Sequence, residues 1–443
     1  MAVAQRHFPH DITTLIIDIL GEGLLDPDDT DCCPALANCL LVSRSFCHHS
    51  RRHLFRAVAL QNSPVDSFFE RVAQLREIMA PRSNPLLGMI SYIRVFSVEV
   101  LSDPSKTVYR KNGPGLATIL EAFLHFESHL EDFGFWGCDI QWKRLGQTVH
   151  NLIQSIVRSP SLSTIHLSGL DGMPVSVLTG ASCKNLHLRR LTMGNCVDDG
   201  ASTLNLEIIP QLQLEAFATD NTFPLEYLSS NGPRAELPNV STSPFSHLRK
   251  LVLEFNSTQE CREAPIVLLK VMGSLQEMDV VLRTARLPHP KFIFPTINIG
   301  RFPKLQMLRL EQQYWSSSTF SPENSPSVVS ILHPTMPCMS LERLDLHFNT
   351  HCIVNSMSPL HEAPIWCNID ALLSPSQFPS LKRVGLLFSM DLYMPVHLGP
   401  SARAEFLADA VPRLREAFPL LSISNSIEFT VEIRGIGGIS TIR

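Results

Sequence analysis

The sequence predicts an α/β protein built from stacked strand–helix units, in which a parallel sheet forms one face and helices cover the other. An apolar six-residue template recurs along the chain, and the segments between its copies often carry a helical apolar face. With 44% hydrophobic and 18% charged residues, the composition is that of a folded protein. A chain of 443 residues is too long for one ordinary core, so it divides into domains or repeats.

The segment FPHDITTLIIDILGEG near the start predicts a helix. Its apolar residues follow the i, i+3, i+4, i+7, i+8 spacing of one helix face, at Ile12, Leu15, Ile16, Ile19 and Leu20. Pro9 lies near the first turn, where its missing N–H costs nothing, and Gly21 lies where a left-handed C-cap is expected.

Two further short helices and a strand are expected before residue 60. LLDPDDTDCCP is rich in Asp and Pro and predicts a loop, after which residues 35–50 again place apolar residues near helical spacing. RRHLF predicts a third short helix or turn, and residues 56–60 alternate like a strand. Three short helices make a core that is barely sufficient alone, at roughly 25 cal/mol per Å² of apolar surface buried. Such a module needs a neighbour.

The order of these features resembles an F-box, in the form common at the start of proteins of mushroom-forming fungi. The resemblance rests on Phe8 and Pro9, on the amphipathic helix that ends in IIDIL, and on LVSRSF and RRHLF. The chain departs from the family pattern in having Phe46 where Trp is usual and a long acidic loop at residues 26–31. The resemblance covers about residues 7–60 and places an F-box-like helical module over residues 1–55, ahead of a repeat region over residues 56–443.

What the resemblance implies is docking to the adaptor Skp1 and, through it, to a cullin in a cullin–RING ubiquitin ligase. Physically, apolar side chains that the small module does not bury for itself become the anchors of a binding surface. The side chains expected to contribute, each of which also fits a place in the module's own core, are Phe8, Pro9, Ile12, Ile16, Leu41, Val42 and Phe46.

The rest of the chain repeats the template L-x-x-L-x-L, with any apolar residue allowed at the fixed places. Copies begin at residues 93, 130, 162, 188, 248, 275, 305, 341 and 381, and a degenerate copy begins at residue 214, with 26 to 40 residues between starts. The template predicts a strand whose first, fourth and sixth places point into a core. Between the copies, residues 65–79, 115–130 and 148–157 predict helices.

This alternation resembles an irregular leucine-rich-repeat solenoid, which implies a curved stack with the parallel sheet on the concave face and the helices on the convex face. Four segments rich in Pro, Ser and Asn predict long loops, at residues 221–244, 283–300, 312–327 and 349–367. Such loops either recognise a binding partner or are surface insertions without a binding role. Residues 426–433 predict a strand at the closing edge of the sheet. The charges of Glu428 and Glu432 would disfavour pairing of this edge with another chain.

On the open face of such a sheet, the third, fifth and seventh template places point away from the core. In the later copies these places are strongly charged and give a predicted target-binding set of Lys250, Glu254, Glu277, Asp279, Arg309, Glu311, Arg343, Asp345, His347 and Arg383. The earlier copies give Trp136, Thr164, His166, Ser168, Arg190 and Thr192. The charged set either pairs with a polar segment of a protein partner or pairs laterally between strands, as Glu277 with Lys250 or Arg309 with Asp279.

The sequence contains no phosphate-binding loop, zinc-protease or nucleophile-elbow motif, so we expect no catalytic residue and no cofactor. Cys47, His48, His49 and His53 include preferred zinc ligands, but adjacent residues on a helix do not all turn to one metal, so no metal site is expected. The net charge of −5 provides no basic field, and the arginines between residues 44 and 56 lack interleaved aromatics, so no nucleic-acid partner is expected.

The sequence therefore predicts a non-catalytic substrate-receptor subunit of a Skp1–cullin–F-box ubiquitin ligase, with the solenoid holding a protein target of unknown identity. The alternative is a leucine-rich-repeat interaction scaffold whose F-box-like helices only cap the first repeat. Neither a signal-peptide core nor an apolar run of ~18 residues is found, so we expect no membrane association and a cytoplasmic or nuclear location. The eleven cysteines form no C-x-x-C pair and are interpreted as reduced, mostly buried thiols.

Overall fold

The computed structural model divides the chain into two compact units, which are described separately. Unit 1 comprises Met1–Cys183 and Arg190–Leu212, and unit 2 comprises Lys184–Arg189 and Gln213–Arg443. The structure describes residues 10–23, 31–61, 65–79, 89–101, 108–125, 128–192, 212–220, 244–255, 268–283, 297–314, 326–353, 364–393, 400–435 and 438–440. The predicted domain boundary after residue 55 falls within unit 1 and stays a prediction.

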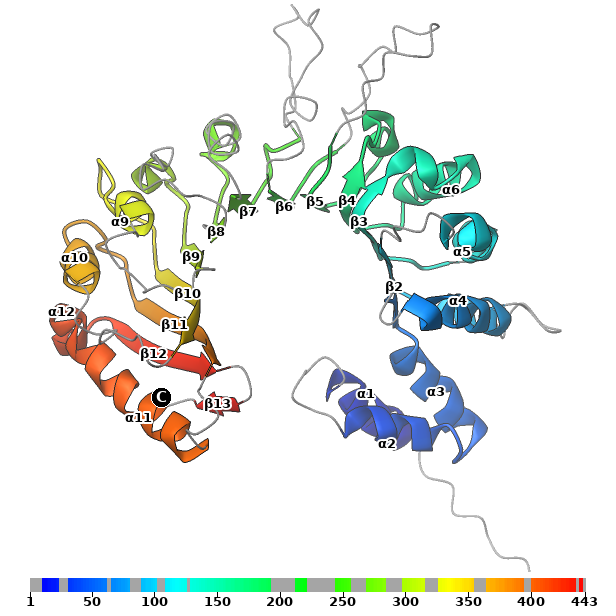
Figure 1. The fold of residues 1–443 in the computed structure, drawn as a ribbon, viewed down its shortest axis with the longest axis horizontal. Helices are drawn as coiled ribbons and strands as arrows, with labels where there is room; N and C mark the ends of the chain where they lie inside the picture. Colours follow the sequence, from blue (N-terminus) through cyan, green and yellow to red (C-terminus); the bar gives the residue numbers. More distant parts are fainter. Residues whose placement is uncertain are drawn as a thin grey trace, which may run out of the picture. The chain divides into compact units, whose positions relative to one another are not determined.

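In the part of unit 1 that the structure describes, four parallel strands lie side by side in chain order, β1 to β4. Three helices precede them, α1 (His10–Gly23), α2 (Cys32–Cys39) and α3 (Arg44–Leu54). The strands are β1 (Ala57–Leu60), β2 (Val95–Leu101), β3 (Asp132–Gln141) and β4 (Thr164–Asp171). The segments that connect them contain α4 (Val65–Met79), the short 3-10 helix η2 (Met89–Tyr92), α5 (Val108–His125) and α6 (Gln147–Val157), and the last three α-helices cover one face of the sheet (Figure 1).

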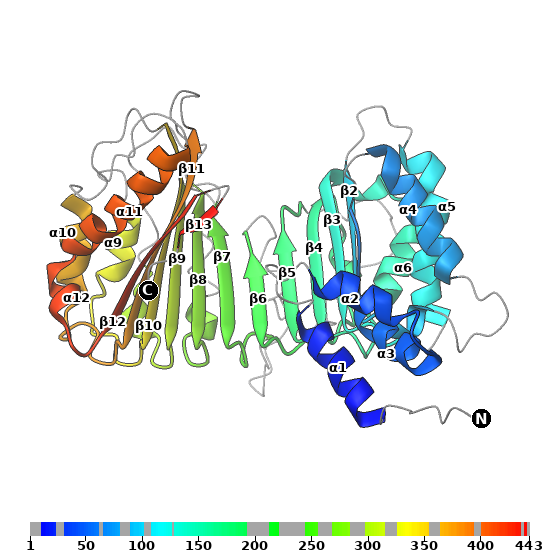
Figure 2. The ribbon, with the colours of Figure 1, turned by 90° about the horizontal axis from the view of Figure 1, so that it is seen from below.

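The described residues of unit 2 show the same pattern, with eight parallel strands and a final antiparallel one. The strands, seen side by side in Figure 2, are β5 (Asn185–Arg189), β6 (Ala216–Thr219), β7 (Lys250–Phe255), β8 (Glu277–Arg283), β9 (Met307–Tyr314), β10 (Arg343–Ile353), β11 (Arg383–Tyr393), β12 (Glu428–Gly435) and β13 (Gly438–Ser440). The helices labelled in this unit lie on one face of the strands and are α9 (Pro326–Leu332), α10 (Pro364–Leu372), α11 (Pro400–Glu416) and α12 (Pro419–Ile423). The short 3-10 helix η6 (Ile299–Arg301) precedes β9.

This arrangement confirms the predicted α/β class with parallel strands and helices on one face of the sheet. The helix predicted over residues 65–79 is α4, and the helix predicted over residues 148–157 is α6 with one added residue. The helix predicted over residues 115–130 is displaced, because α5 begins at Val108 and ends at His125. In both units, the described α-helices of the strand region lie on one face of the strands, and the opposite face is called the open face below.

The template correctly identified the core side of the strands. Its first, fourth and sixth places are almost completely buried in copy after copy, as at Leu305, Leu308 and Leu310, none of which is more than 1% exposed. Because side chains alternate across a strand, the third and fifth places lie on the face opposite the helices. The template therefore orients each strand as well as locating it.

One copy of the template was placed wrongly. The strand expected from residue 188 is β5, Asn185–Arg189, whose core residues are Leu186 and Leu188. Its first template place is Cys183, which is buried and replaces the usual leucine. Arg190 has a positive φ of 49°. The chain therefore turns where the prediction placed the third residue of a strand, and Arg190 and Thr192 do not lie on the sheet.

The helical module at the start differs from the prediction in its boundaries. Residues 35–50 are not one helix, because α2 ends at Cys39 and α3 begins at Arg44, with the RRHL of RRHLF forming the end of α3. Ser43 caps α3, its Oγ accepting a hydrogen bond from the Phe46 N–H at 3.3 Å. Gly21 is not a C-cap, since α1 continues to Gly23. A Cβ at residue 21 would collide with the ring of His53, so the glycine allows α1 and α3 to approach closely.

In unit 2, an aromatic cluster anchors the helices to the last strands. Trp366 of α10 meets Phe348 of β10 and Phe388 of β11 edge-on, at ring-centroid distances of 5.2 and 5.5 Å. Phe418, just before α12, extends the cluster at 5.8 Å from Trp366. Such pairs add to the stability gained from burial alone, so this end of unit 2 is rigidly packed.

Several predicted loops and the predicted edge strand need correction. The loops expected from residues 312 and 349 begin too early, because β9 continues to Tyr314 and β10 to Ile353. Most of the four predicted loops lie outside the described residues. Residues 426–433 contain most of β12, but this strand does not close the sheet, since β13 pairs antiparallel with it.

Candidate protein-interaction surfaces

The first candidate surface is an apolar stripe on α1. Ile12, Leu15, Ile16 and Ile19 are 43%, 59%, 41% and 60% exposed, and their i, i+3, i+4, i+7 spacing places them along one side of the helix. Ile17, on another side of the helix, is completely buried and contributes to the core of the module. The helix is therefore apolar on more than one side, and the wider apolar side faces away from its own module.

Leu41 and Val42, in the short connection between α2 and α3, extend the apolar surface of the module. They are 86% and 63% exposed, so almost none of the Leu41 side chain and little of the Val42 side chain is covered by the module. Phe46, in the first turn of α3, is half-buried. Of the residues predicted to bind an adaptor, Ile12, Ile16, Leu41 and Val42 are thus exposed, whereas Phe8 and Pro9 lie outside the described residues. Leu15 and Ile19 are equally exposed but were not selected from the sequence.

Polar contacts join α3 to α1 and to the short helix η2. His53 of α3 meets Asp18 of α1 with Nε2 and Oδ1 2.8 Å apart, beside the close approach at Gly21. His48 Nδ1 lies 2.9 Å from the hydroxyl of Tyr92 in η2, which connects α3 to the segment before β2. These partners account for two of the histidines that had suggested zinc. Among the described residues, no group of three or more His, Cys, Asp or Glu side chains is placed to hold a metal ion.

The second candidate surface is the open face of the sheet in unit 2, which carries ion pairs within and between strands. Lys250 and Glu277 are 3.1 Å apart between β7 and β8, as the lateral-pairing interpretation predicts. Arg343 reaches Asp345 on its own strand at 2.9 Å, and Arg383 reaches Glu428 across to β12 at 2.8 Å. Most of the charges on this face already have partners, so their pairing stabilises the sheet.

At the centre of this face, Arg309 has partners that the sequence does not predict. Arg309 is the register neighbour of Asp279, yet its guanidinium bonds to Glu311 at 3.0 Å and to His347 Nδ1 at 2.9 Å. Asn349 donates a hydrogen bond to the other oxygen of Glu311 at 2.8 Å. The expected pairing of Arg309 with Asp279 is therefore replaced by a diagonal network across β9 and β10.

Burial changes the acid–base properties of two residues in this centre. It raises the pKa of Asp279 above the ordinary value of an aspartate, against the opposing effects of Lys250 and Arg309. It also lowers the pKa of His347, and the positive charge of Arg309 acts in the same direction. His347 is thereby held neutral, as its acceptor role toward Arg309 requires.

Glu254 of β7 has the deepest position among the predicted target-binding residues. It is only 4% exposed and lies between Arg283 of β8 at 2.5 Å and Arg189 of β5 at 3.6 Å. A buried carboxylate needs such compensation, so Glu254 mainly holds neighbouring strands together. The other nine members of the predicted set, Lys250, Glu277, Asp279, Arg309, Glu311, Arg343, Asp345, His347 and Arg383, lie on the same face as predicted.

Comparison of the sequence with models of protein families gives no match, and comparison with curated proteins gives none either. Among the described helices, none is long and apolar enough to cross a membrane. The two surfaces are therefore interpreted from their own chemistry, which is apolar on α1–α3 and polar on the open face of the sheet.

Proposed function

We propose that the chain is a non-catalytic substrate-receptor subunit of a Skp1–cullin–F-box ubiquitin ligase. In this proposal α1–α3 form an F-box-like module that binds a Skp1-like adaptor and, through it, a cullin. The strands and helices of residues 56–443 form an irregular leucine-rich-repeat-like solenoid that holds a protein target. The single observation that carries the proposal is the exposed apolar stripe on α1. Leu41 and Val42 of the same module are exposed aliphatic side chains as well.

An exposed apolar surface of this kind favours a helix-packing partner. A small module that left four aliphatic side chains of one helix in water would lose most of the free energy that their burial provides, roughly 25 cal/mol per Å². A partner helix that covers them recovers that free energy, and the i, i+3, i+4, i+7 anchors of α1 match this mode of recognition. The adaptor-binding role proposed for Ile12 and Ile16 follows from this exposure.

The alternative, in which the helices only cap the repeats, accounts less well for the same surface. A cap covers the end of the sheet with its apolar side and leaves its polar side outside. Here α3 makes the contact to η2, while the apolar stripe of α1 remains exposed. The receptor proposal explains this exposure, because an adaptor would cover the stripe. The capping proposal does not account for apolar side chains that remain in water.

In the proposed complex the chain performs no chemistry itself. It accelerates ubiquitin transfer by holding the target near a conjugating enzyme bound elsewhere in the assembly, so its contribution is proximity. Such a role suits an open sheet face with rigidly held polar groups, and it places the chain in the cytoplasm or nucleus, where these ligases act.

The adaptor half of the proposal is tested by co-expression with a Skp1-like adaptor and affinity capture. We expect the wild-type chain to retain the adaptor and the Ile16→Asp, Leu41→Asp double variant to lose it. Leu15→Asp and Ile19→Asp should each weaken capture, because these residues share the exposed stripe.

Ile78→Asp is the matched control, since Ile78 is 49% exposed but lies on α4, away from the stripe. It should bind the adaptor like the wild type, and circular dichroism should show that every variant folds. Failure of the wild-type chain to retain the adaptor would contradict the receptor proposal and favour a scaffold capped by its first three helices.

A further inference from the structure

The open face of the sheet in unit 1 differs chemically from that in unit 2. Strands β2, β3 and β4 present an exposed tryptophan and two acids on this face, and their residues include no lysine or arginine. By contrast, each strand from β7 to β12 carries a basic residue, and these are Lys250, Arg283, Arg309, Arg343, Arg383 and Arg434. The unit 1 face is thus acidic and aromatic.

Trp136 of β3 forms the centre of this face. The indole lies over Gly134, two residues earlier on the same strand, since a Cβ placed there would meet the ring carbons at 3.2 and 3.3 Å. His166 of β4 lies beside the indole, with the ring centroids 6.2 Å apart. Trp136 remains 37% exposed, although the two other described tryptophans, Trp142 and Trp366, are buried. Its position is therefore defined, but its ring is not enclosed by the core.

Two carboxylates lie on the same face as the indole. Glu99 of β2 is the register neighbour of Trp136 and has neither a hydrogen bond nor an ion pair with another residue that the structure describes. Asp132, four residues before Trp136, lies 3.5 Å from His166 Nε2. This arrangement contrasts with unit 2, where most acids on the open face contact a lysine or arginine.

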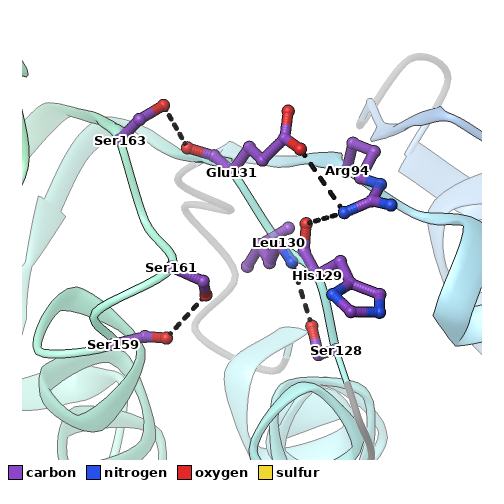
Figure 3. A network of polar contacts seen from close by, with 8 residues as sticks. All are labelled: Arg94, Ser128, His129, Leu130, Glu131, Ser159, Ser161 and Ser163. Carbon is purple, nitrogen blue, oxygen red and sulfur yellow. Dashed lines mark hydrogen bonds and ion pairs between the residues drawn. The ribbon is translucent and has the colours of Figure 1, made fainter.

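The backbone beneath this surface is firmly held. At the start of the strands, the Arg94 guanidinium donates to the carbonyl of His129 at 3.3 Å and meets Glu131 at 3.4 Å (Figure 3). Ser163 donates to the carbonyl of Glu131 at 3.0 Å, which connects the start of β4 to that of β3. Behind the strands, Phe96, Phe133 and Phe135 are completely buried. Little ordering is therefore needed before the face binds a ligand.

We infer that the open face of β2–β4 binds a lysine or arginine side chain in a basic segment of the protein target. The face of an indole attracts a cation, and Glu99 provides an unpaired carboxylate on the adjacent strand. The acidic character of the surface excludes the phosphate backbone of a nucleic acid. This inference rests on the proposed receptor function and assigns the class of target that its sheet recognises.

The inference is tested by isothermal titration of the full chain with short synthetic peptides. Peptides that alternate Ser with Lys or Ser with Arg are compared with matched Ser/Gln and Ser/Glu peptides. We expect the basic peptides to bind and the Glu peptide to give no detectable heat. Equal binding of the Gln and Lys peptides, or preference for the Glu peptide, would overturn the inference.

Variants then assign the binding to this face. Trp136→Ala and Glu99→Gln should each weaken the binding of the Lys peptide about fivefold or more, because each variant loses a cation–π contact or an ion pair. Trp136→Phe should retain part of the affinity, because an aromatic face remains. Leu124→Ala and Glu342→Gln are the matched controls, since both residues are exposed, Leu124 lies on helix α5 and Glu342 belongs to unit 2. Unchanged affinity in both Trp136→Ala and Glu99→Gln would place the peptide elsewhere and overturn the inference.

The adaptor experiment distinguishes this inference from the proposed function. Trp136→Ala should still capture the Skp1-like adaptor, because α1–α3 are unchanged. A chain that binds the Lys peptide through Trp136 but never binds the adaptor retains the basic-segment site and loses the ubiquitin-ligase assignment. A chain that binds the adaptor but does not bind the Lys peptide keeps the ubiquitin-ligase assignment and has no basic-segment site on this face.

Discussion

The carboxylate of Asp370 in α10 accepts a hydrogen bond from the backbone N–H of Leu421 in α12 at 3.0 Å, and its other oxygen accepts from Leu420 at 2.8 Å. The residue before α12 is Phe418, whose side chain has no acceptor for these donors. Asp370 is 3% exposed and therefore serves as an N-terminal cap supplied by a neighbouring helix.

Replacing Asp370 with Ala should lower the free energy of unfolding by about 1–3 kcal/mol, because two buried backbone donors lose their acceptor. The measurement is urea unfolding followed by circular dichroism. Asp409→Ala is the matched control, since Asp409 is exposed and pairs with Arg413 within α11. The control should change stability by less than about 0.5 kcal/mol. Equal effects of the two substitutions would contradict the capping role.

Glu254→Gln should also destabilise unit 2. The substitution removes the charge that compensates Arg189 and Arg283, and we expect a loss of about 1–3 kcal/mol, less than for a fully buried pair because both arginines are partly exposed. Glu215→Gln is the comparison, because Glu215 forms an exposed pair with Lys184. Its effect should be much smaller than that of Glu254→Gln, because water screens an exposed ion pair. A Glu254→Gln variant as stable as wild type in urea would show that the carboxylate does not hold these strands.

Much of the fold was predictable because the strand template encodes burial directly. An apolar residue at the first, fourth and sixth places defines both the position of a strand and the side that meets the core. The copy from residue 188 was misplaced because Cys183 occupies the first place of the true strand, and cysteine is an uncommon member of this pattern. The signal was nevertheless present, as cysteine is often buried.

Side-chain partners were less predictable than strand positions. The sequence places Asp279 beside Arg309 in register, but Arg309 instead contacts Glu311 and His347. Neighbouring positions on a sheet allow several pairings, and the length and rotamer of the arginine select one of them. Likewise, helical spacing identified the apolar stripe of α1, whereas its exposure depends on Ile17 filling the module core.

Stability should fall with decreasing pH through the titration of His347. Burial and Arg309 lower its pKa in the folded state, so the stability that it contributes is present above its unfolded pKa and is lost as the pH falls through that value toward the folded one. Between about pH 7.5 and pH 5, unfolding free energies should decrease more for the wild type than for His347→Gln. Parallel pH profiles for the two proteins would contradict this assignment.

Asp279 should have the opposite pH dependence. Its pKa is raised by burial in the folded state, so its contribution to stability is fully present below its unfolded pKa and is lost as the pH rises through the folded one. Asp279→Asn should consequently be more stable than the wild type at pH 7, and the difference should narrow as the pH approaches about 4. A variant that is less stable at pH 7 would show that attraction to Lys250 and Arg309 outweighs burial.

Thiol reactivity should separate core cysteines from surface ones. Burial raises the pKa of Cys183 to about 12 and also raises that of Cys338, and both side chains are 1% exposed. Because the thiolate is the reactive form, brief treatment of the native protein with N-ethylmaleimide at pH 7.5 should label the exposed Cys33 and Cys367 and spare these two. Peptide mass spectrometry measures the labelling, and the same treatment in urea should modify all eleven cysteines. Rapid labelling of Cys183 in the native protein would contradict its burial in the core of unit 1.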